Sequence, residues 1–500
     1  MEEKLNQLKS RLAEVIDLFR VANLLSWDQQ TCMPPGGAKE RGEQLGTIRR
    51  LAHIKLTSDE IGKILDELKP MVAGLDPDSD AARLVKVTNR EYEKRTKVPP
   101  KLVSELAELA AVAHQAWEQA RAENNFPKFQ PYLEKVVDLR RRYAACFEPY
   151  EHVYDPLLAE YEPGMKTAEV QQIFADLRPQ QVALIKEITN RPQVDDSALH
   201  QHFDPQKQWD FGLEVITKFG YDWQRGRQDK AAHPFTSNFG IGDVRITTRI
   251  LPDYVASALF STMHEAGHGM YEQGIDPSLG RTLLGETFSH ALHESQSRMW
   301  ENLVGRSKPF WQHFYPRLQE YFPTQLGNVP LETFYKGINK VEPSLIRVEA
   351  DEATYNLHIM LRLELEIALV SGELEVKDLP EAWNSRMHDY LGITPPDNAS
   401  GVLQDVHWAH GYIGYFSTYA LGNLISTQLW ERINADIPDL EDQIRQGKFD
   451  QLLDWGRQKV HQHGCKFDAQ ELVKQITGSQ IDAAPYMRYL TSKYSEIYGL

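Results

Sequence analysis

The chain has 500 residues, with 55 lysines and arginines against 71 aspartates and glutamates, so its formal net charge is 55 − 71 = −16. This acidic balance argues against a nucleic-acid partner, and no uncharged apolar run reaches the roughly 18 residues of a membrane span. The three cysteines, Cys32, Cys146 and Cys465, lack metal-type or disulfide-type spacing and fit a reducing cytoplasm.

The first 230 residues are expected to form a series of long amphipathic helices. The N-terminus lacks the pattern of a signal peptide, and its apolar residues recur at helical spacing instead. Lys101–Asn124 and Thr167–Thr189 have the same periodicity, and proline-rich breaks at 34–37 and 99–100 separate the helices. Since no linker or repeat divides the chain, we expect one catalytic domain over residues 1–500, shaped as two lobes.

A short segment between His233 and Ile250 departs from this helical pattern. Residues 239–250 alternate in the manner of a strand or hairpin and lead directly into the next helix. Such a strand could pair with an extended peptide along a cleft, or it could only stabilise the fold. The sequence leaves both interpretations open.

The next segment, Asp253–Gly274, is predicted to be one helix, with Asp253 as N-cap and Gly274 as its stop. Its apolar side chains form one stripe that faces a core. That stripe consists of Val255, Leu259, Met263, Ala266 and Met270.

This helix carries the pattern His264-Glu265-Ala266-Gly267-His268. Residues four apart lie on one face of a helix, so both imidazoles can reach one tetrahedral metal ion. Glu265 then lies beside that ion, where it can take a proton from the attacking water. The alternative is a pair of structural histidines without a metal.

A third metal ligand is expected on a second helix, Thr287–Val304, which is ended by Gly305. Candidates after His268 are Glu272, Glu286, His290, His293 and Glu294. We favour Glu294, 26 residues after His268, because a separate helix closes the coordination sphere with little strain. Spacing alone leaves its neighbour His293 open.

Two further helical segments are expected, from Pro343 to Leu369 and from Gly401 to Trp430. The second contains glycines and aromatic residues that suit a close-packed junction between a loop and a helix near a cleft. Clusters of this kind also occur in ordinary cores.

Several separated motifs together resemble the carboxypeptidase Taq family of metallopeptidases. They occur along the whole chain in the order that the family has. They are Trp27-Asp28, His233-Pro234-Phe235, the DxRxT pattern of Asp243, Arg245 and Thr247, the HExxH at 264–268, His293-Glu294-Ser295-Gln296, the IRxxAD pattern at 346–351 and GxxQDxHW at 401–408.

The resemblance implies a mostly α-helical fold similar to neurolysin and angiotensin-converting enzyme. Two lobes would surround a deep groove, with a small β-sheet at the cleft edge and a site drawn mainly from residues 231–425. It also implies a cytoplasmic homodimer that removes single residues from the free C-termini of peptides, with broad specificity and resistance to C-terminal proline.

The resemblance further assigns Glu294 as the third ligand of a zinc ion, for which Co²⁺ or Mn²⁺ could substitute. Glu265 would be the general base, and Tyr415, helped by His407, would stabilise the oxyanion. Tyr415 could equally be a core aromatic residue, and His407 a structural histidine.

Substrate recognition is expected from a guanidinium, which pairs with both oxygens of a carboxylate. Arg347 matches the family arginine for this role, with Arg245 as the alternative. Arg347 could instead pair with Asp351 on its own helix. Tyr412 and His233 complete the expected substrate contacts, by looser analogy.

The chain differs from angiotensin-converting enzyme at one expected site position, and two other functions remain open. Gly414 stands where angiotensin-converting enzyme has a chloride-binding arginine, so chloride activation is not expected. A zinc endo-oligopeptidase would use the same metal chemistry, and an inactive scaffold could use the acidic groove to hold a partner. The intact His264, Glu265 and His268 argue against the scaffold.

Overall fold

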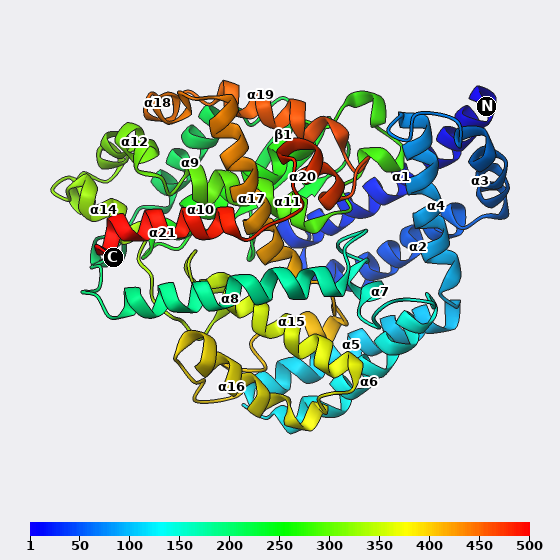
Figure 1. Cartoon of the computed structure of the whole chain (residues 1–500), viewed down its shortest axis with the longest axis horizontal. Coiled ribbons are helices and arrows are strands. Elements are labelled where there is room, and N and C mark those ends of the chain that lie inside the picture. The colour runs from blue at the N-terminus through cyan, green and yellow to red at the C-terminus, as the bar shows by residue number, and fades with distance from the viewer.

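The computed structural model of the chain describes all residues from 1 to 500 and is built almost entirely from helices (Figure 1). The N-terminal end consists of four helices, which gather at the right of Figure 1. They are α1 (Glu2–Thr31), α2 (Ala38–Leu56), α3 (Asp59–Val72) and α4 (Asp80–Lys97).

Among the next helices, α8 runs through the middle of the molecule in Figure 1, α5 and α6 lie below it and α9 lies above it. Their bounds are α5 (Pro100–Ala122), α6 (Phe126–Ala145), α7 (Asp155–Leu158), α8 (Thr167–Thr189) and α9 (Pro205–Phe219). Two helices expected from periodicity are confirmed here, since α5 and α8 match them to within two residues.

The C-terminal half adds the remaining helices, with α15 and α16 beside α5 and α6, and most others on the opposite side of α8. The bounds are α10 (Val255–Gln273), α11 (His290–Arg298), α12 (Lys308–Tyr321), α13 (Pro323–Leu326), α14 (Leu331–Ile338), α15 (Tyr355–Ser371), α16 (Leu379–Leu391), α17 (Ser417–Asp436), α18 (Leu440–Arg445), α19 (Asp450–Lys459), α20 (Ala469–Thr477) and α21 (Ala484–Tyr498). No helix is long and apolar enough to cross a membrane.

Two separate hydrophobic cores support the expected two-lobed shape. The larger has 104 buried residues, and the smaller has 17, most of them from α1, α3 and α4. Leu8, Leu12, Val15 and Ile16 of the predicted N-terminal stripe lie in the smaller core. That core also takes in Ile275, Leu279, Leu283 and Leu284, so the N-terminal helices pack directly on the connection between α10 and α11.

One small sheet lies beside α10, with strand order β1-β3-β2. Strands β2 (Thr236–Asn238) and β3 (Val244–Thr248) form the expected antiparallel hairpin, whereas β1 (Gly226–Lys230) pairs parallel with β3. The expectation of helices alone up to residue 230 is therefore wrong. The sequence of β1, Gly-Arg-Gln-Asp-Lys, has no alternation of apolar and polar residues from which a strand could have been predicted.

Helix α10 begins one residue later than expected. Its N-cap is Tyr254, without a side-chain cap, while Asp253 is exposed and lies 3.5 Å from His202. Gly274 does end the helix, and the five residues of the predicted stripe are all buried.

Two segments expected to be helical throughout, Pro343–Leu369 and Gly401–Trp430, are helical only in their later parts. The first stays irregular up to α15 because the Asp351 carboxylate accepts the N–H groups of Ala353 and Thr354, at 2.8 and 3.0 Å, in a turn. The second stays irregular from 401 to 416. Gly414 there has φ 104°, and a Cβ on it would lie 2.3 Å from the Leu157 carbonyl oxygen. The expected loop-to-helix junction is thus confirmed, with α17 starting only at Ser417.

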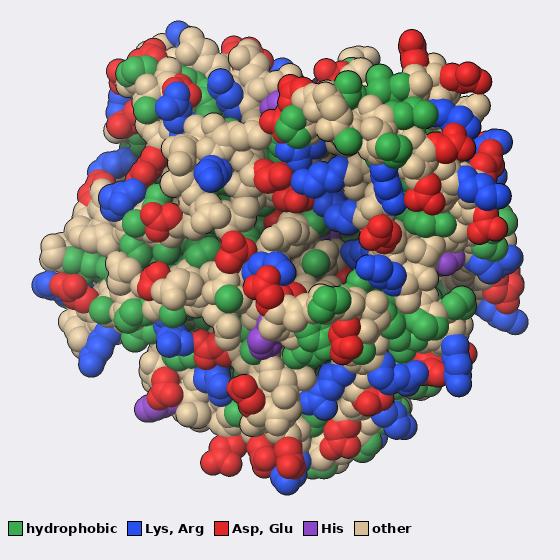
Figure 2. Space-filling model, turned by 45° about the vertical axis from the view of Figure 1, so that its right-hand side comes forward, with side chains coloured by type: hydrophobic (Ala, Val, Ile, Leu, Met, Phe, Trp, Pro, Cys, Tyr) green, Lys and Arg blue, Asp and Glu red, His purple; other side chains and the backbone are tan.

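The surface is hollowed near the middle of the face in Figure 2, and Lys and Arg side chains line part of the rim of this hollow. A mostly α-helical fold with a groove and a small sheet, as expected from the sequence, is therefore confirmed.

Candidate metal centre and active site

The candidate site begins where α10 and α11 cross at backbone contact. A Cβ at Gly267 of α10 would lie 2.7 Å from the Cα of Ser297 in α11, and one at Gly422 of α17 would lie 2.6 Å from the Glu294 Cβ. Real Cβ atoms essentially never come this close, so glycine at both positions lets α11 lie tightly between α10 and α17.

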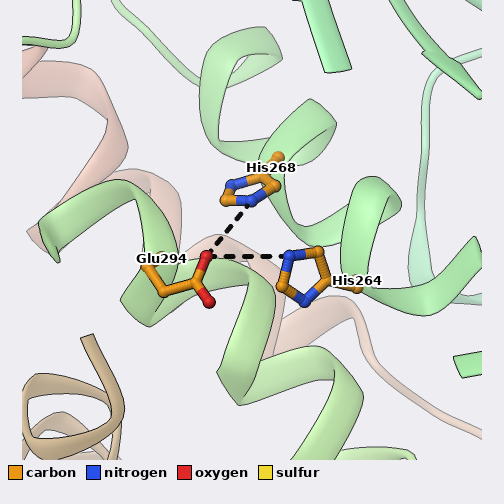
Figure 3. Close-up of side chains that lie close together, drawn as sticks. All are labelled: His264, His268 and Glu294. Carbon is orange, nitrogen blue, oxygen red and sulfur yellow. Dashed lines mark ion pairs between the residues drawn. The ribbon is translucent and has the colours of Figure 1, made fainter. Parts of the chain in front are cut away.

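This close packing brings three side chains together (Figure 3). The Nε2 atoms of His264 and His268 each lie 3.6 Å from one carboxylate oxygen of Glu294. All three ligand atoms lie within 4.8 Å of one another. A tetrahedral ion with ligand distances of about 2.1 Å would separate its ligands by roughly 3.4 Å, so the three residues fit one metal ion.

Each of the three side chains is held by a further partner on its other side. The Glu301 carboxylate lies 2.8 Å from the Nδ1 of His264, and the Arg298 Nε donates to Glu294 at 2.7 Å. The Nδ1 of His268 contacts the Nδ1 of His293. These contacts occupy the far ring nitrogen of both histidines and leave each Nε2 directed at Glu294, as metal-binding imidazoles require.

The contact network continues outward from His293. Its Nε2 lies 3.0 Å from Glu272, whose carboxylate also accepts hydrogen bonds from Asn238 of β2 and Thr287. Two of the five ligand candidates, His293 and Glu272, thus form the surroundings of His268. Helix α11 ends in a π-helical turn, Met299–Val304, which carries Glu301. Turns of this kind are frequent at functional sites.

The charge states of the three side chains follow from their burial and neighbours. Burial lowers the pKa of His268 to about 3, so this imidazole is neutral. Burial would also lower the pKa of His264, but the carboxylates of Glu294 and Glu301 outweigh it and raise that pKa. Burial alone would raise the pKa of Glu294, yet Arg298 and His264 hold it well below its ordinary value. The site therefore presents a carboxylate and two imidazoles in an acidic setting, which suits a divalent cation.

Glu265 lies on the same helix, next to His264, and is held by the sheet. Its carboxylate accepts a hydrogen bond of 2.6 Å from the Thr236 hydroxyl on β2. Burial raises the pKa of Glu265, although His264 and Thr236 oppose the shift. A carboxylate with a raised pKa is better matched to proton transfer near neutral pH.

The loop from 401 to 416 brings the predicted aromatic residues towards α11. The Tyr415 ring packs edge-on against His290, with centroids 5.4 Å apart, one turn before Glu294. His407 lies 5.5 Å from Tyr415, and Tyr412, which is 46% exposed, lies 6.3 Å from it. Tyr415 is half-buried rather than part of the closed core.

Arg347 is 5% exposed and does not pair with Asp351. Its Nε and Nη2 donate to Asp405 at 3.1 and 2.9 Å, and its Nη1 donates to the Tyr355 hydroxyl at 2.8 Å. The interpretation of an ion pair within one helix is therefore wrong, because Asp351 caps its own turn. The Tyr355 ring lies 4.8 Å from Arg298, so Arg347 is one aromatic residue away from the ligand network.

Arg245 lies in strand β3 and His233 in the connection before β2, and neither contacts this network. Arg245 pairs with Asp243 at 2.8 Å and is stacked between Trp27 of α1 and Phe239, at 4.6 and 4.9 Å. His233 is exposed in the connection between β1 and β2. Thr247, the last residue of the DxRxT pattern, accepts the Phe235 N–H at 2.9 Å and so braces the hairpin.

Several residues of the site were not predicted from the sequence. Arg298 and Glu301 stand four and seven residues after Glu294, so helical spacing could have indicated them. Thr236 and Asp405 stand far along the sequence from Glu265 and Arg347, and Tyr355 follows Arg347 by eight residues across a turn, so helical spacing does not connect these pairs.

Comparisons with known proteins connect the chain with one group of metallopeptidases. The sequence profile of the carboxypeptidase Taq (M32) metallopeptidases matches residues 7–494. Thermostable carboxypeptidase 1 of Thermus thermophilus is 43% identical over 496 residues, covering 97% of both chains, and carboxypeptidase 1 of Bacillus subtilis is 39% identical over 480 residues, covering 95% of both. The crystal structure of an M32 carboxypeptidase from Deinococcus radiodurans covers 100% of both chains with a TM-score of 0.97 at 39% identity.

Replacing Glu301 with glutamine tests the support of His264. The variant loses the charged acceptor at Nδ1, and changes of this kind typically weaken metal binding roughly 10- to 100-fold. Competition with a chromophoric chelator measures the affinity for Zn²⁺. Glu431→Gln, which removes a carboxylate from an exposed ion pair with Arg488, is the control and should bind normally. Equal affinities for both variants would contradict the role of Glu301.

Metal affinity should also depend on pH through His264. His268 is already neutral at pH 5 and above because its pKa is about 3, whereas the raised pKa of His264 keeps its ring protonated at mildly acidic pH. Since a proton on His264 competes with the metal, the apparent Zn²⁺ affinity should fall about tenfold per pH unit below that pKa. A titration of metal binding from about pH 8 to about pH 5 would contradict this if the affinity stayed constant.

Proposed function

The chain belongs to the carboxypeptidase Taq (M32) family of metallopeptidases and is a metallocarboxypeptidase, and we propose that His264, His268 and Glu294 hold its metal ion. The observation that carries the assignment is the convergence of both Nε2 atoms on one Glu294 oxygen, at 3.6 Å each. We propose zinc as the ion, although Co²⁺ and Mn²⁺ accept the same ligands. The alternative of an endo-oligopeptidase is not favoured, since the similar relatives are carboxypeptidases.

Glu265 is the proposed general base. When bound, a divalent ion supplies Lewis-acid polarisation of the scissile carbonyl and lowers the pKa of water towards about 7. Glu265 takes the proton of the attacking water and passes it to the departing amine. The hydrogen bond from Thr236 holds the carboxylate in one orientation during both transfers.

Tyr415 and His407 are the proposed donors to the oxyanion that develops on the carbonyl oxygen. The position of the Tyr415 ring against His290, one turn before Glu294, supports this role. Burial lowers the pKa of His407 to about 4, so its neutral ring can donate a hydrogen bond. A donor of this kind typically contributes about 3 kcal/mol to transition-state stabilisation.

Arg347 is the proposed partner of the substrate's C-terminal carboxylate. It lies one aromatic residue from the ligand network, and three of its five N–H groups are bonded to Asp405 and Tyr355. Tyr412, exposed on the same loop as Tyr415, would contact the last substrate residue. Arg245 is already engaged with Asp243, Trp27 and Phe239, so we assign it, with His233, to outer substrate contacts along the sheet.

We further propose that residues 1–500 act as one catalytic unit on peptides with a free C-terminus, with the site drawn mainly from residues 231–425. A cytoplasmic location is in keeping with the three free cysteines. The homodimer is proposed from the family resemblance alone.

A pair of substrates tests this assignment. The enzyme, loaded with Zn²⁺, is given one peptide with a free C-terminus and the same peptide as its C-terminal amide, and mass spectrometry records the products. We expect stepwise trimming of the free acid and at least a roughly hundredfold lower kcat/KM for the amide, because a desolvated guanidinium left without its carboxylate costs about 3 kcal/mol. Equal cleavage of both peptides, or internal cuts, would contradict a carboxypeptidase.

A further inference from the structure

Behind Arg347 lies a second guanidinium, Arg362 on α15, that is fully buried. Both arginines bind Asp405, but at different oxygens. Arg347 donates to Oδ1 at 2.9 and 3.1 Å, whereas the Nε of Arg362 donates to Oδ2 at 2.7 Å. Arg362 also donates to the His358 carbonyl at 2.6 Å, and Trp383 lies 4.5 Å from its guanidinium. One carboxylate is therefore divided between two cations.

The buried group formed by Arg347, Arg362 and Asp405 carries an excess of positive charge. Asp405 is the only carboxylate that forms an ion pair with either arginine. The imidazoles beside it add no further charge, since His358 is fully buried with neither ring nitrogen hydrogen-bonded and His407 is neutral. Two guanidiniums and one carboxylate leave a net charge of +1, and an unpaired buried charge is strongly unfavourable unless an anion joins it.

The two arginines differ in their access to the substrate. Arg347 faces Tyr355 and Tyr419, with the Tyr419 ring 5.2 Å away, and Tyr419 in turn packs on Tyr415. The next residue, Val348, is 70% exposed. Arg362 lies on the far side of Asp405, against Trp383 and Phe416, where no substrate can reach it. Arg362 therefore cannot contact the substrate, and it can influence recognition only through its charge and through its hold on Asp405.

We propose that Arg362 is a positioning residue for recognition of the substrate's C-terminal carboxylate. By holding Oδ2 of Asp405, Arg362 fixes the carboxylate that orients Arg347. Its positive charge also compensates the negative charge of Asp405, which would otherwise neutralise Arg347. The charge of Arg347 thus remains available to the substrate, whose carboxylate completes a group of two cations and two anions. This inference rests on the proposed role of Arg347.

Neutral substitutions of Arg362 test the proposal. Arg362→Met removes the charge and keeps the length of the side chain. Steady-state kinetics on the free-acid peptide should show a KM roughly 10- to 50-fold higher, the size expected for one charge removed at about 7 Å in a medium with an effective dielectric constant of about 20. The value of kcat should change less than twofold, because Arg362 does not contact the reacting atoms. Inhibition by an N-acetyl amino acid should weaken by the same factor.

Arg362→Lys separates charge from simple packing. It retains the cation beside Asp405, so it should restore KM to within about threefold of the wild-type value. If Arg362→Met does not fold, Arg362→Gln removes the charge while keeping a donor for Asp405 and takes its place. Arg386 of α16 is half-buried and pairs with Glu364 of α15, so Arg386→Met is the matched control and should leave KM unchanged.

An unchanged KM in a folded neutral variant would overturn the proposal. The proposal would also be overturned if the neutral variants and the lysine variant showed the same fall in kcat and the same rise in KM. That result is expected of a residue that only stabilises the fold. If instead the wild-type enzyme cleaved the amide as well as the free acid, the role of Arg347 itself would be wrong. A wild-type preference for the free acid, combined with no effect of Arg362, overturns this inference alone.

Discussion

The backbone contact between α10 and α11 is the constraint on which the rest of the site depends. A metal ion accepts its ligands only within a few ångströms, and Glu294 reaches the two histidines because Gly267 and Gly422 let α11 lie tightly between its neighbours. The two partners that hold His264 and Glu294, Glu301 and Arg298, then follow along the same helical rod and its π-helical turn. The glycines at these crossings thus fix the proposed ligands and the residues that hold them at the same time.

Two buried groups of charged side chains lie on either side of Tyr355, one with an excess of negative charge and the other with an excess of positive charge. Around His264 and His268, the three carboxylates of Glu294, Glu301 and Glu265 outnumber the two cations Arg298 and Arg306, which suits a divalent cation. On the other side, Arg347 and Arg362 outnumber Asp405, which suits a carboxylate. Since the Tyr355 ring contacts Arg298 and its hydroxyl accepts from Arg347, one side chain separates the two groups. This arrangement matches a substrate whose scissile bond lies one residue from its free C-terminus.

The sequence was sufficient to predict those parts of the site that depend on local spacing. His264, Glu265 and His268 stand on one helix at fixed intervals, and Glu294 was favoured because it lies on the next helix. The pairing of Arg347 with Asp405 spans 58 residues and replaces the helical partner Asp351 that spacing suggested. Neither Arg362, which belongs to no motif, nor the polar strand β1 leaves a pattern in the sequence. Long-range pairing between loops is set by the packed fold, so it could be learned only from the structure.

The most direct test of the account is anomalous X-ray diffraction at the zinc absorption edge from a crystal of the Zn²⁺-loaded protein. The account predicts one peak per chain, about 2.0–2.2 Å from the Nε2 of His264, the Nε2 of His268 and a carboxylate oxygen of Glu294. A peak at any other position, or a Glu294 side chain turned away from the ion, would contradict it.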